Sequence, residues 1–143
     1  MSIDLQAANK VIRTGIQLAR ELKLRPLTLC VLDTGGHVVS AQREDNSSLL
    51  RFEIAFGKAW GSLGLGHSTR FYEDVLVKIR PYFANSLEAA SKGRFITVYG
   101  GVLIRSTQGE LLGVIGVTGD TGANDEKIAV MALEQCGFKA DLS

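Results

Sequence analysis

The sequence predicts a single α+β domain built around an antiparallel sheet. Segments with the apolar spacing of helices are interspersed with short apolar segments typical of strands. Tight, glycine-containing turns join strand segments that follow each other, so such neighbours must run antiparallel. The 143 residues correspond to one domain, long enough to bury a core without disulfides or metals.

The first helix is predicted over residues 3–23, where apolar side chains recur every three or four positions. Ser2 or Asp4 can supply the oxygen that caps its first turn. The helix should end before Pro26, because proline disfavours the α conformation in the residue that precedes it.

A β-hairpin should follow, with a strongly apolar strand over residues 27–33, a Thr-Gly-Gly turn over residues 34–36 and a returning strand over residues 37–43. Helical spacing resumes over residues 48–63, which are interrupted by glycines. Each glycine inside a helix costs about 1 kcal/mol relative to alanine. Their presence indicates that a neighbouring backbone or a ligand comes close to this helix.

Shorter helical segments are expected over residues 67–79 and 82–93, and the last third of the chain returns to sheet. Residues 94–101 contain a short strand, residues 101–119 form a second hairpin, and residues 124–136 form a closing helix. The prediction is therefore a sheet of about five strands with helices around it.

Composition argues against several classes of protein. The formal net charge of +1 is too small to attract a nucleic-acid backbone. No run of about 18 apolar residues could cross a membrane, and the N-terminus has no signal-peptide pattern. Cys30 and Cys136 lack the spacing of a thiolate zinc site, so we expect no metal site. We therefore expect a cytoplasmic protein without nucleic-acid or membrane partners.

The glycine-rich segment Gly113–Glu126 joins the last strand to the closing helix. It lacks the Gly-Lys-Ser/Thr of a P-loop, and its GxxGxxG spacing differs from the GxGxxG of a dinucleotide site. What remains is a helix N-terminus with free backbone N–H groups, which Thr121 or Asn124 can cap. Two interpretations stay open, a purely structural corner or part of the wall of a ligand site.

Three segments carry a resemblance to a known family: VLDTGGHVVSAQRED, IAFGKAWGSLGLGHSTR and YGGVLIRSTQGELLGVIGVTGDTGANDE. On these motifs, nearly the whole chain resembles the GlcG/HbpS family, which includes the C-terminal domain of PduO-type proteins. The resemblance implies a profilin-like fold, with an antiparallel sheet flanked by helices, and a homo-oligomer. Some members bind haem and others belong to glycolate or diol metabolism, so the resemblance makes haem the leading candidate for ligand and cofactor.

Lys58 lies in the middle helix, beside the glycines of that helix. Its ammonium group can either snorkel to solvent or point into a pocket and bind a carboxylate or a haem propionate. The A-x-x-K-A motif shared with the family favours the pocket. We predict that the glycines of this helix and of the last corner leave a hollow, with Lys58 at its wall.

Arg43 and Asp45 end the second strand, and Arg51 starts the next helix. A surface ion pair between Arg43 and Asp45 is one interpretation. The other is an anion-binding arginine oriented by the aspartate, with Arg51 on the same rim. The complete set of predicted ligand-binding residues is Lys58, Arg43, Asp45, Arg51, Gly100, Gly101, Thr118 and Asp125. The candidate ligands of a haem iron are His37, His67, Tyr82 and Tyr99.

The leading hypothesis is a small-ligand-binding protein of the GlcG/HbpS type. Two alternatives stay open. One is an isomerase- or hydratase-like enzyme for a small hydroxy or oxo acid, in which Asp125 or Glu126 moves a proton near Lys58. The other is an oligomeric accessory protein without catalysis.

Overall fold

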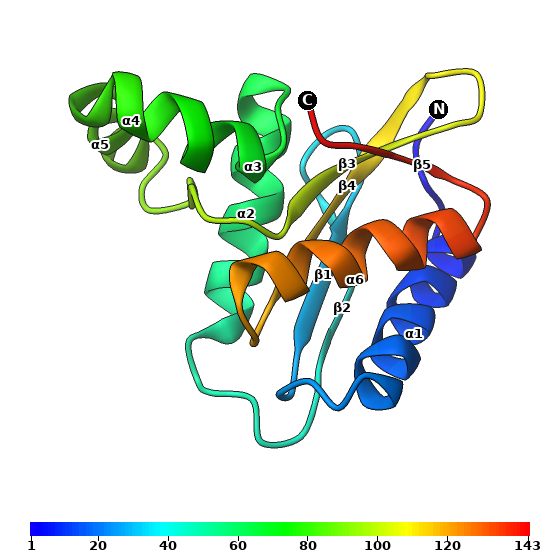
Figure 1. Cartoon of the computed structure of the whole chain (residues 1–143). Helices are drawn as coiled ribbons and strands as arrows, with labels where there is room; N and C mark the ends of the chain where they lie inside the picture. The colour runs from blue at the N-terminus through cyan, green and yellow to red at the C-terminus, as the bar shows by residue number, and fades with distance from the viewer.

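The five strands form one antiparallel sheet in the order β2-β1-β4-β3-β5. The computed structural model describes all residues from 1 to 143. The strands are β1 (Thr28–Leu32), β2 (Val38–Arg43), β3 (Gly101–Arg105), β4 (Leu111–Thr118) and β5 (Lys139–Asp141). The predicted fold class is confirmed, because the chain forms an antiparallel sheet flanked by helices (Figure 1).

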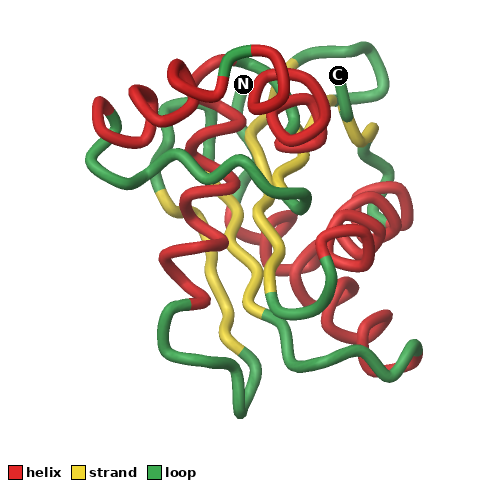
Figure 2. The backbone as a smooth tube through the Cα atoms, turned by 60° about the vertical axis from the view of Figure 1, so that its left-hand side comes forward, coloured by secondary structure: helices red, strands yellow, loops and turns green.

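Three long helices cover the sheet, and a helical arm extends beyond it. On one face lie α1 (Leu5–Glu21) and α6 (Gly122–Gln135), and on the other lies α2 (Arg51–Leu65) (Figure 1, Figure 2). The arm consists of α3 (Thr69–Phe71), the π-helical segment η1 (Tyr72–Leu76), α4 (Val77–Ile79) and α5 (Pro81–Ala90). None of the helices combines the length and the apolar character that a membrane crossing needs.

Side chains alternate between the two faces of the sheet along each strand, so the core is divided into two parts. In β1, Leu29 and Val31 belong to the larger core shared with α1 and α6, whereas Cys30 and Leu32 belong to the smaller core under α2. A strand imposes this period of two because successive side chains point to opposite faces. With both faces covered, β1 is buried along its whole length.

The N-caps of two long helices follow from the local sequence. The backbone N–H of Ala7 donates to Asp4 Oδ1 at 2.8 Å, at the start of α1. The backbone N–H of Asn124 donates to Thr121 Oγ1 at 3.2 Å, at the start of α6. Asp4 and Thr121, each one of two predicted candidates, are therefore the caps.

The prediction of a strand over residues 94–101 is wrong. Residues 94–100 form no strand, and β3 begins only at Gly101. This segment packs on α2 instead, where the backbone N–H of Ile96 donates to the Gly57 carbonyl at 3.3 Å. The fifth strand is β5, near the end of the chain, which pairs with β3. An apolar segment indicates burial, but it does not reveal whether a strand or a helix is its partner.

The glycines at the centre of α2 and β4 face close neighbours. A Cβ atom at Gly57 would lie 2.3 Å from Ile96 Cγ1, and one at Gly116 would lie 2.0 Å from the Ala55 carbonyl oxygen. Their missing side chains let the segment before β3 and the strand β4 approach α2 closely. The predicted hollow is therefore wrong at Gly57 and Gly116, whereas Gly122, in the last corner, lines a pocket together with Lys58.

Candidate functional site

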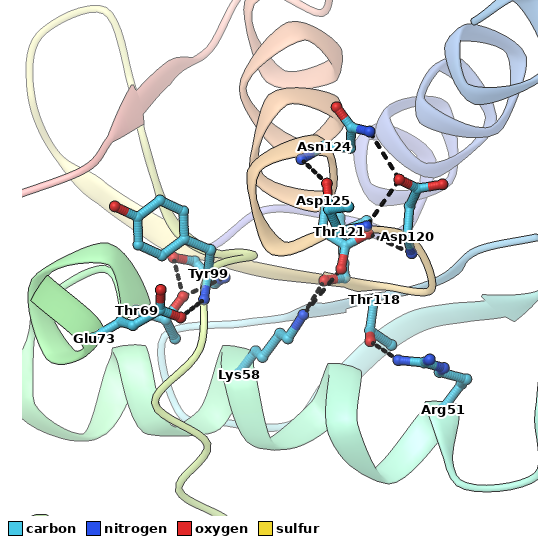
Figure 3. A network of polar contacts seen from close by, with 12 residues as sticks. Arg51, Lys58, Thr69, Glu73, Tyr99, Thr118, Asp120, Thr121, Asn124 and Asp125 are labelled. Atoms are coloured by element: carbon cyan, nitrogen blue, oxygen red, sulfur yellow. Dashed lines mark hydrogen bonds and ion pairs between the residues drawn. The ribbon is translucent and has the colours of Figure 1, made fainter. Parts of the chain in front are cut away.

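A pocket of about 580 Å³ lies where α2, the end of β4 and the start of α6 meet. The segment η1 and the residues just before β3 complete its wall. The lining residues are Arg51, Ile54, Lys58, Glu73, Val98, Tyr99, Thr118, Asp120, Gly122, Ala123 and Asp125. Four residues of the predicted ligand set, Arg51, Lys58, Thr118 and Asp125, are thus brought together (Figure 3).

Lys58 is buried at the wall of this pocket, with only 2% of its side chain exposed. Its Nζ donates to the Val117 carbonyl at 2.9 Å and to Asp125 Oδ2 at 3.3 Å. The snorkelling interpretation of this lysine is therefore wrong. An ammonium group has three N–H donors, and only two of those of Lys58 have a hydrogen-bond acceptor within the chain.

Gly100 and Gly101 make room for Lys58 and its helix. A Cβ at Gly100 would lie 2.9 Å from Lys58 Nζ, and one at Gly101 would lie 2.5 Å from the Lys58 carbonyl oxygen. The backbone N–H of Gly101 donates to Thr69 Oγ1 at 2.8 Å. Both glycines pack against Lys58, and neither is among the residues that line the pocket.

Asp125 is held in place by the corner that precedes α6. Its Oδ1 accepts the backbone N–H of Asp120 at 2.9 Å, while its Oδ2 faces Lys58. Asp120 in turn accepts three hydrogen bonds. The backbone N–H of Arg25 donates at 2.9 Å, and the Thr121 N–H and the Asn124 side chain donate at 2.8 Å each; Figure 3 shows Asn124 and Thr121 beside Asp120. These donors, the Arg25 N–H first among them, lower the pKa of Asp120 to about 2.

Burial acts on both members of the Lys58–Asp125 pair. Desolvation lowers the pKa of Lys58 from its usual value, and it raises the pKa of Asp125. The attraction between the two charges opposes both shifts. Since both shifts favour the neutral forms, moving a proton from the amine to the carboxyl costs less here than in water.

Arg51 brings a second cation to the same wall. It lies two helical turns before Lys58 on α2. Its Nη1 donates to Thr118 Oγ1 at 2.8 Å and its Nε donates to Ser48 Oγ at 3.1 Å. Lys58 and Arg51 thus bind consecutive residues at the end of β4, Val117 and Thr118. The Nη2 of Arg51 makes no hydrogen bond within the chain, so it can bind an anion in the pocket.

Glu73 and Tyr99 also line the pocket, although nothing in the sequence pattern places either beside Lys58. Glu73 Oε1 accepts the backbone N–H of Tyr99 at 3.2 Å, and the Tyr99 hydroxyl donates to Asp74 Oδ2 at 2.5 Å. The Arg70 guanidinium lies over the Tyr99 ring, 5.5 Å from its centre. Glu73 and Asp74 come from η1, and π-helical segments occur often at functional sites. The apolar spacing of residues 67–79 carries no sign of one.

The structure does not bring Arg43 and Asp45 to this pocket. They line a separate surface hollow beside Arg20 and Pro26. The Arg43 guanidinium donates to the Ser47 carbonyl and makes no ion pair with Asp45. The expected pairing and the expected common rim with Arg51 are therefore wrong. Arg43 ends β2, which is an edge strand, whereas the pocket opens at the end of the central strand β4.

Of the four candidate ligands of haem iron, only Tyr99 lines the pocket. His37 is exposed beside the first hairpin turn, with Nδ1 3.2 Å from Asp33 Oδ1. The ring of His67 stacks on Phe71 at 4.1 Å between centres. Tyr82 is 85% exposed on the helical arm.

Comparison with protein families gives a match over nearly the whole chain. The model of the family described as "Haem degrading protein HbpS-like" matches residues 3–134. The chain is 28% identical over 133 residues to an uncharacterised 15.0 kDa protein from the dhaT-dhaS intergenic region of Citrobacter freundii, covering 93% of this chain and 91% of that protein. It is 27% identical over 134 residues to the corrinoid adenosyltransferase PduO of the same organism, of which it spans only 38%.

Solved structures share the fold. A PduOC:heme complex superimposes with a TM-score of 0.85 at 23% identity and 99% coverage of both chains. The Klebsiella pneumoniae protein ORFY gives a TM-score of 0.80 at 27% identity, covering 94% of this chain and 89% of that one. HbpS gives 0.74 at 21% identity, covering 94% and 90%. The arrangement of strands and helices around the pocket is therefore shared with these proteins.

Proposed function

Because this chain belongs to the "Haem degrading protein HbpS-like" family, we propose that it binds a small ligand in the pocket beside Lys58, with haem as the leading candidate. The observation that carries the proposal is the pocket itself. At about 580 Å³ it falls within the range of small-molecule sites, and it places two cations on one wall. The haem in the PduOC complex supports the choice of ligand, because that protein has the same fold.

The lining residues suit the chemistry of haem. Ile54, Val98 and Ala123 offer apolar surface to a macrocycle, and the free Nη2 of Arg51 is suited to a propionate. Tyr99 is the one residue in the lining of a type that ligates haem iron. Bound haem would supply an iron centre for redox or ligand-binding chemistry. The protein's own part is to bind the propionate, exclude water from the ring and position the phenol.

Haem titration followed by the Soret band tests this proposal. We expect a saturable shift in the wild-type protein. The Arg51→Gln variant should bind about tenfold more weakly, as the loss of one charge-assisted hydrogen bond implies. Arg13, which is exposed on α1, provides the matched control Arg13→Gln, with unchanged affinity. A spectrum that shows no saturable shift in the wild type would rule out haem as the ligand.

A second pair of variants tests the iron ligand. Tyr99→Phe should change the position of the Soret band if the phenol binds the iron. The exposed Tyr82 provides the control Tyr82→Phe, whose spectrum should match the wild type. Identical spectra for all three proteins would exclude Tyr99 as the ligand.

We also infer that the protein works in the cytoplasm as an assembly of identical chains. Two free thiols, at Cys30 and Cys136, suit a reducing compartment. The arm exposes large apolar side chains, with Ile79 72% and Tyr82 85% exposed, and surfaces of this kind favour contact between proteins. The near-neutral charge supports a small molecule, rather than a nucleic acid, as the ligand.

A further inference from the structure

The pocket beside Lys58 has the parts of a site for covalent capture of a carbonyl compound. A lysine can attack a carbonyl carbon only as the neutral amine, which burial and a nearby proton acceptor both favour. Lys58 is almost fully buried, Asp125 Oδ2 lies 3.3 Å from its Nζ, and both residues line the same pocket. Surface lysines of this chain have no such arrangement.

We propose that Lys58 forms an imine with a small 2-oxo acid, with Asp125 carrying the proton and Arg51 binding the carboxylate. This activity goes beyond the binding of haem and does not depend on it. The substrate class follows from the two cations. Lys58 and Arg51 line the same pocket and are bound to the consecutive residues Val117 and Thr118, so one ligand can meet both cations, the amine at a carbonyl and the guanidinium at the carboxylate next to it, as in a 2-oxo acid.

The steps balance without a further reactant. Lys58 first passes one ammonium proton to the Asp125 carboxylate. The amine nitrogen then attacks the carbonyl carbon, so that a C–N bond forms, the C=O π bond breaks, and a proton moves from nitrogen to oxygen. Asp125 returns its proton to the hydroxyl group, the C–O bond breaks, and water leaves. The product is a protonated imine on Lys58 beside the Asp125 carboxylate, with the same total charge as at the start.

The surroundings of Lys58 restrict the substrate to small molecules. The Nζ is held between the Val117 carbonyl and Asp125, and a Cβ at Gly100 would already lie 2.9 Å from it. Glu73, which lines the same pocket, is the other acid that acts on the charge of Lys58. It disfavours a second carboxylate at that end of the substrate, so we expect monocarboxylic 2-oxo acids to react best.

Reductive trapping tests the proposal. The ligand-free protein is incubated with pyruvate, reduced with sodium borohydride and digested for peptide mass spectrometry. We expect one reduced adduct per chain, located on Lys58. An adduct spread over exposed lysines such as Lys127, or none at all, would overturn the proposal. Because the site is mapped in the wild type, this result does not depend on whether a variant folds.

Variants separate the roles of the two cations. Lys58→Arg should lose the adduct, while the exposed control Lys127→Arg should keep it. Arg51→Gln should reduce trapping of pyruvate about tenfold, the effect of one lost charge-assisted hydrogen bond, and should affect trapping of acetaldehyde, which has no carboxylate, much less. An equal loss for both probes would exclude carboxylate binding by Arg51. Imine trapping is measured by mass spectrometry and haem binding by the Soret band. The imine proposal and the haem proposal can therefore fail independently.

Discussion

Lys58 shows what a buried charge requires of its surroundings. Its ammonium group has a carboxylate partner in Asp125 and a backbone partner in the Val117 carbonyl. Removing one member of a buried pair leaves the other charged and without compensation. The pair therefore makes the pocket wall sensitive to single substitutions.

At this scale we predict that Lys58→Met lowers the free energy of unfolding by about 3–5 kcal/mol, because Asp125 stays buried without a partner. The double variant Lys58→Met with Asp125→Asn should be more stable than Lys58→Met alone, since asparagine is neutral and still accepts the Asp120 N–H. Urea unfolding measures both. Effects of the two substitutions that simply add would show that the residues are not coupled. Lys127→Met should change stability by no more than about 0.5 kcal/mol.

The lowered pKa of Asp120 predicts that the stability of the folded protein falls at low pH. Its pKa is about 2 in the folded protein and near its ordinary value of 3.8 in the unfolded chain. Its contribution to stability is therefore complete above about pH 4, and it is lost as the pH falls toward 2. We expect the unfolding free energy of Asp120→Asn to fall less between pH 4 and 2 than that of the wild type. Parallel curves, or a normal pKa for Asp120 by NMR, would contradict this.

At the scale of elements, the contact between α2 and β4 determines where the pocket lies. Gly116 allows this contact, because a Cβ there would lie 2.0 Å from the Ala55 carbonyl oxygen and 3.1 Å from the Ala59 nitrogen. Lys58 stands on the helix that this contact positions. Changes at Gly116 should therefore reach the site although Gly116 does not line it.

We predict that Gly116→Ala lowers the free energy of unfolding by about 1–3 kcal/mol, because it overpacks the contact between α2 and β4. Gly64 is a matched control on α2, since a Cβ there would meet only Trp60, at 3.9 Å. Gly64→Ala should stabilise the protein by roughly 1 kcal/mol through helix propensity. Thermal and urea unfolding measure both variants. A destabilised Gly64→Ala protein, or an unaffected Gly116→Ala protein, would refute the packing that we describe.

At the scale of the whole molecule, the helices that cover the two faces of the sheet leave the arm as an exposed apolar surface. Figure 1 shows α4 and α5 projecting past the sheet. Ile79 and Tyr82 lie at this projection and are largely exposed. Contact with a second copy of the chain would bury them, which is why we propose the arm as the contact of the proposed assembly.

We predict that the wild-type protein elutes as an oligomer in size-exclusion chromatography with light scattering. The double variant Ile79→Glu with Tyr82→Glu should have a smaller mass, because charged groups at the contact disfavour its burial. Arg13→Glu on α1 should not change the mass. A wild-type monomer at micromolar concentration would exclude the assembly, and an unchanged mass for the double variant would exclude the arm as its contact.

Much of the fold could be predicted because it depends on local rules. The spacing of apolar residues located the long helices, glycine-containing turns located the two hairpins, and Asp4 and Thr121 were recognisable as caps. The prediction of a strand over residues 94–101 failed because the partner of this segment is distant in the sequence. Phe95 is buried as the apolar pattern indicated, whereas Val98 is 45% exposed, and a strand pattern does not reveal that the partner is α2.

The candidate site was only partly predictable. Lys58, Arg51, Thr118 and Asp125 stand out as polar residues within or at the ends of recognisable elements. Nothing local distinguishes Arg43, which was predicted and lies elsewhere, from Arg51, which lines the pocket. The difference arises in the sheet order. Arg43 ends the edge strand β2, whereas Arg51 stands on α2, next to the end of the central strand β4, where the pocket opens.

The sequence by itself determined the three long helices, the two hairpins with their antiparallel connections and the presence of a lysine within an apolar helix. These follow from turn chemistry and periodicity, which act over a few residues. Only the tertiary structure decided that Lys58 meets Asp125, and that Glu73 and Tyr99 line the same pocket. Those contacts join segments far apart in the chain, and they depend on how closely glycines let α2, β4 and the segment before β3 approach one another.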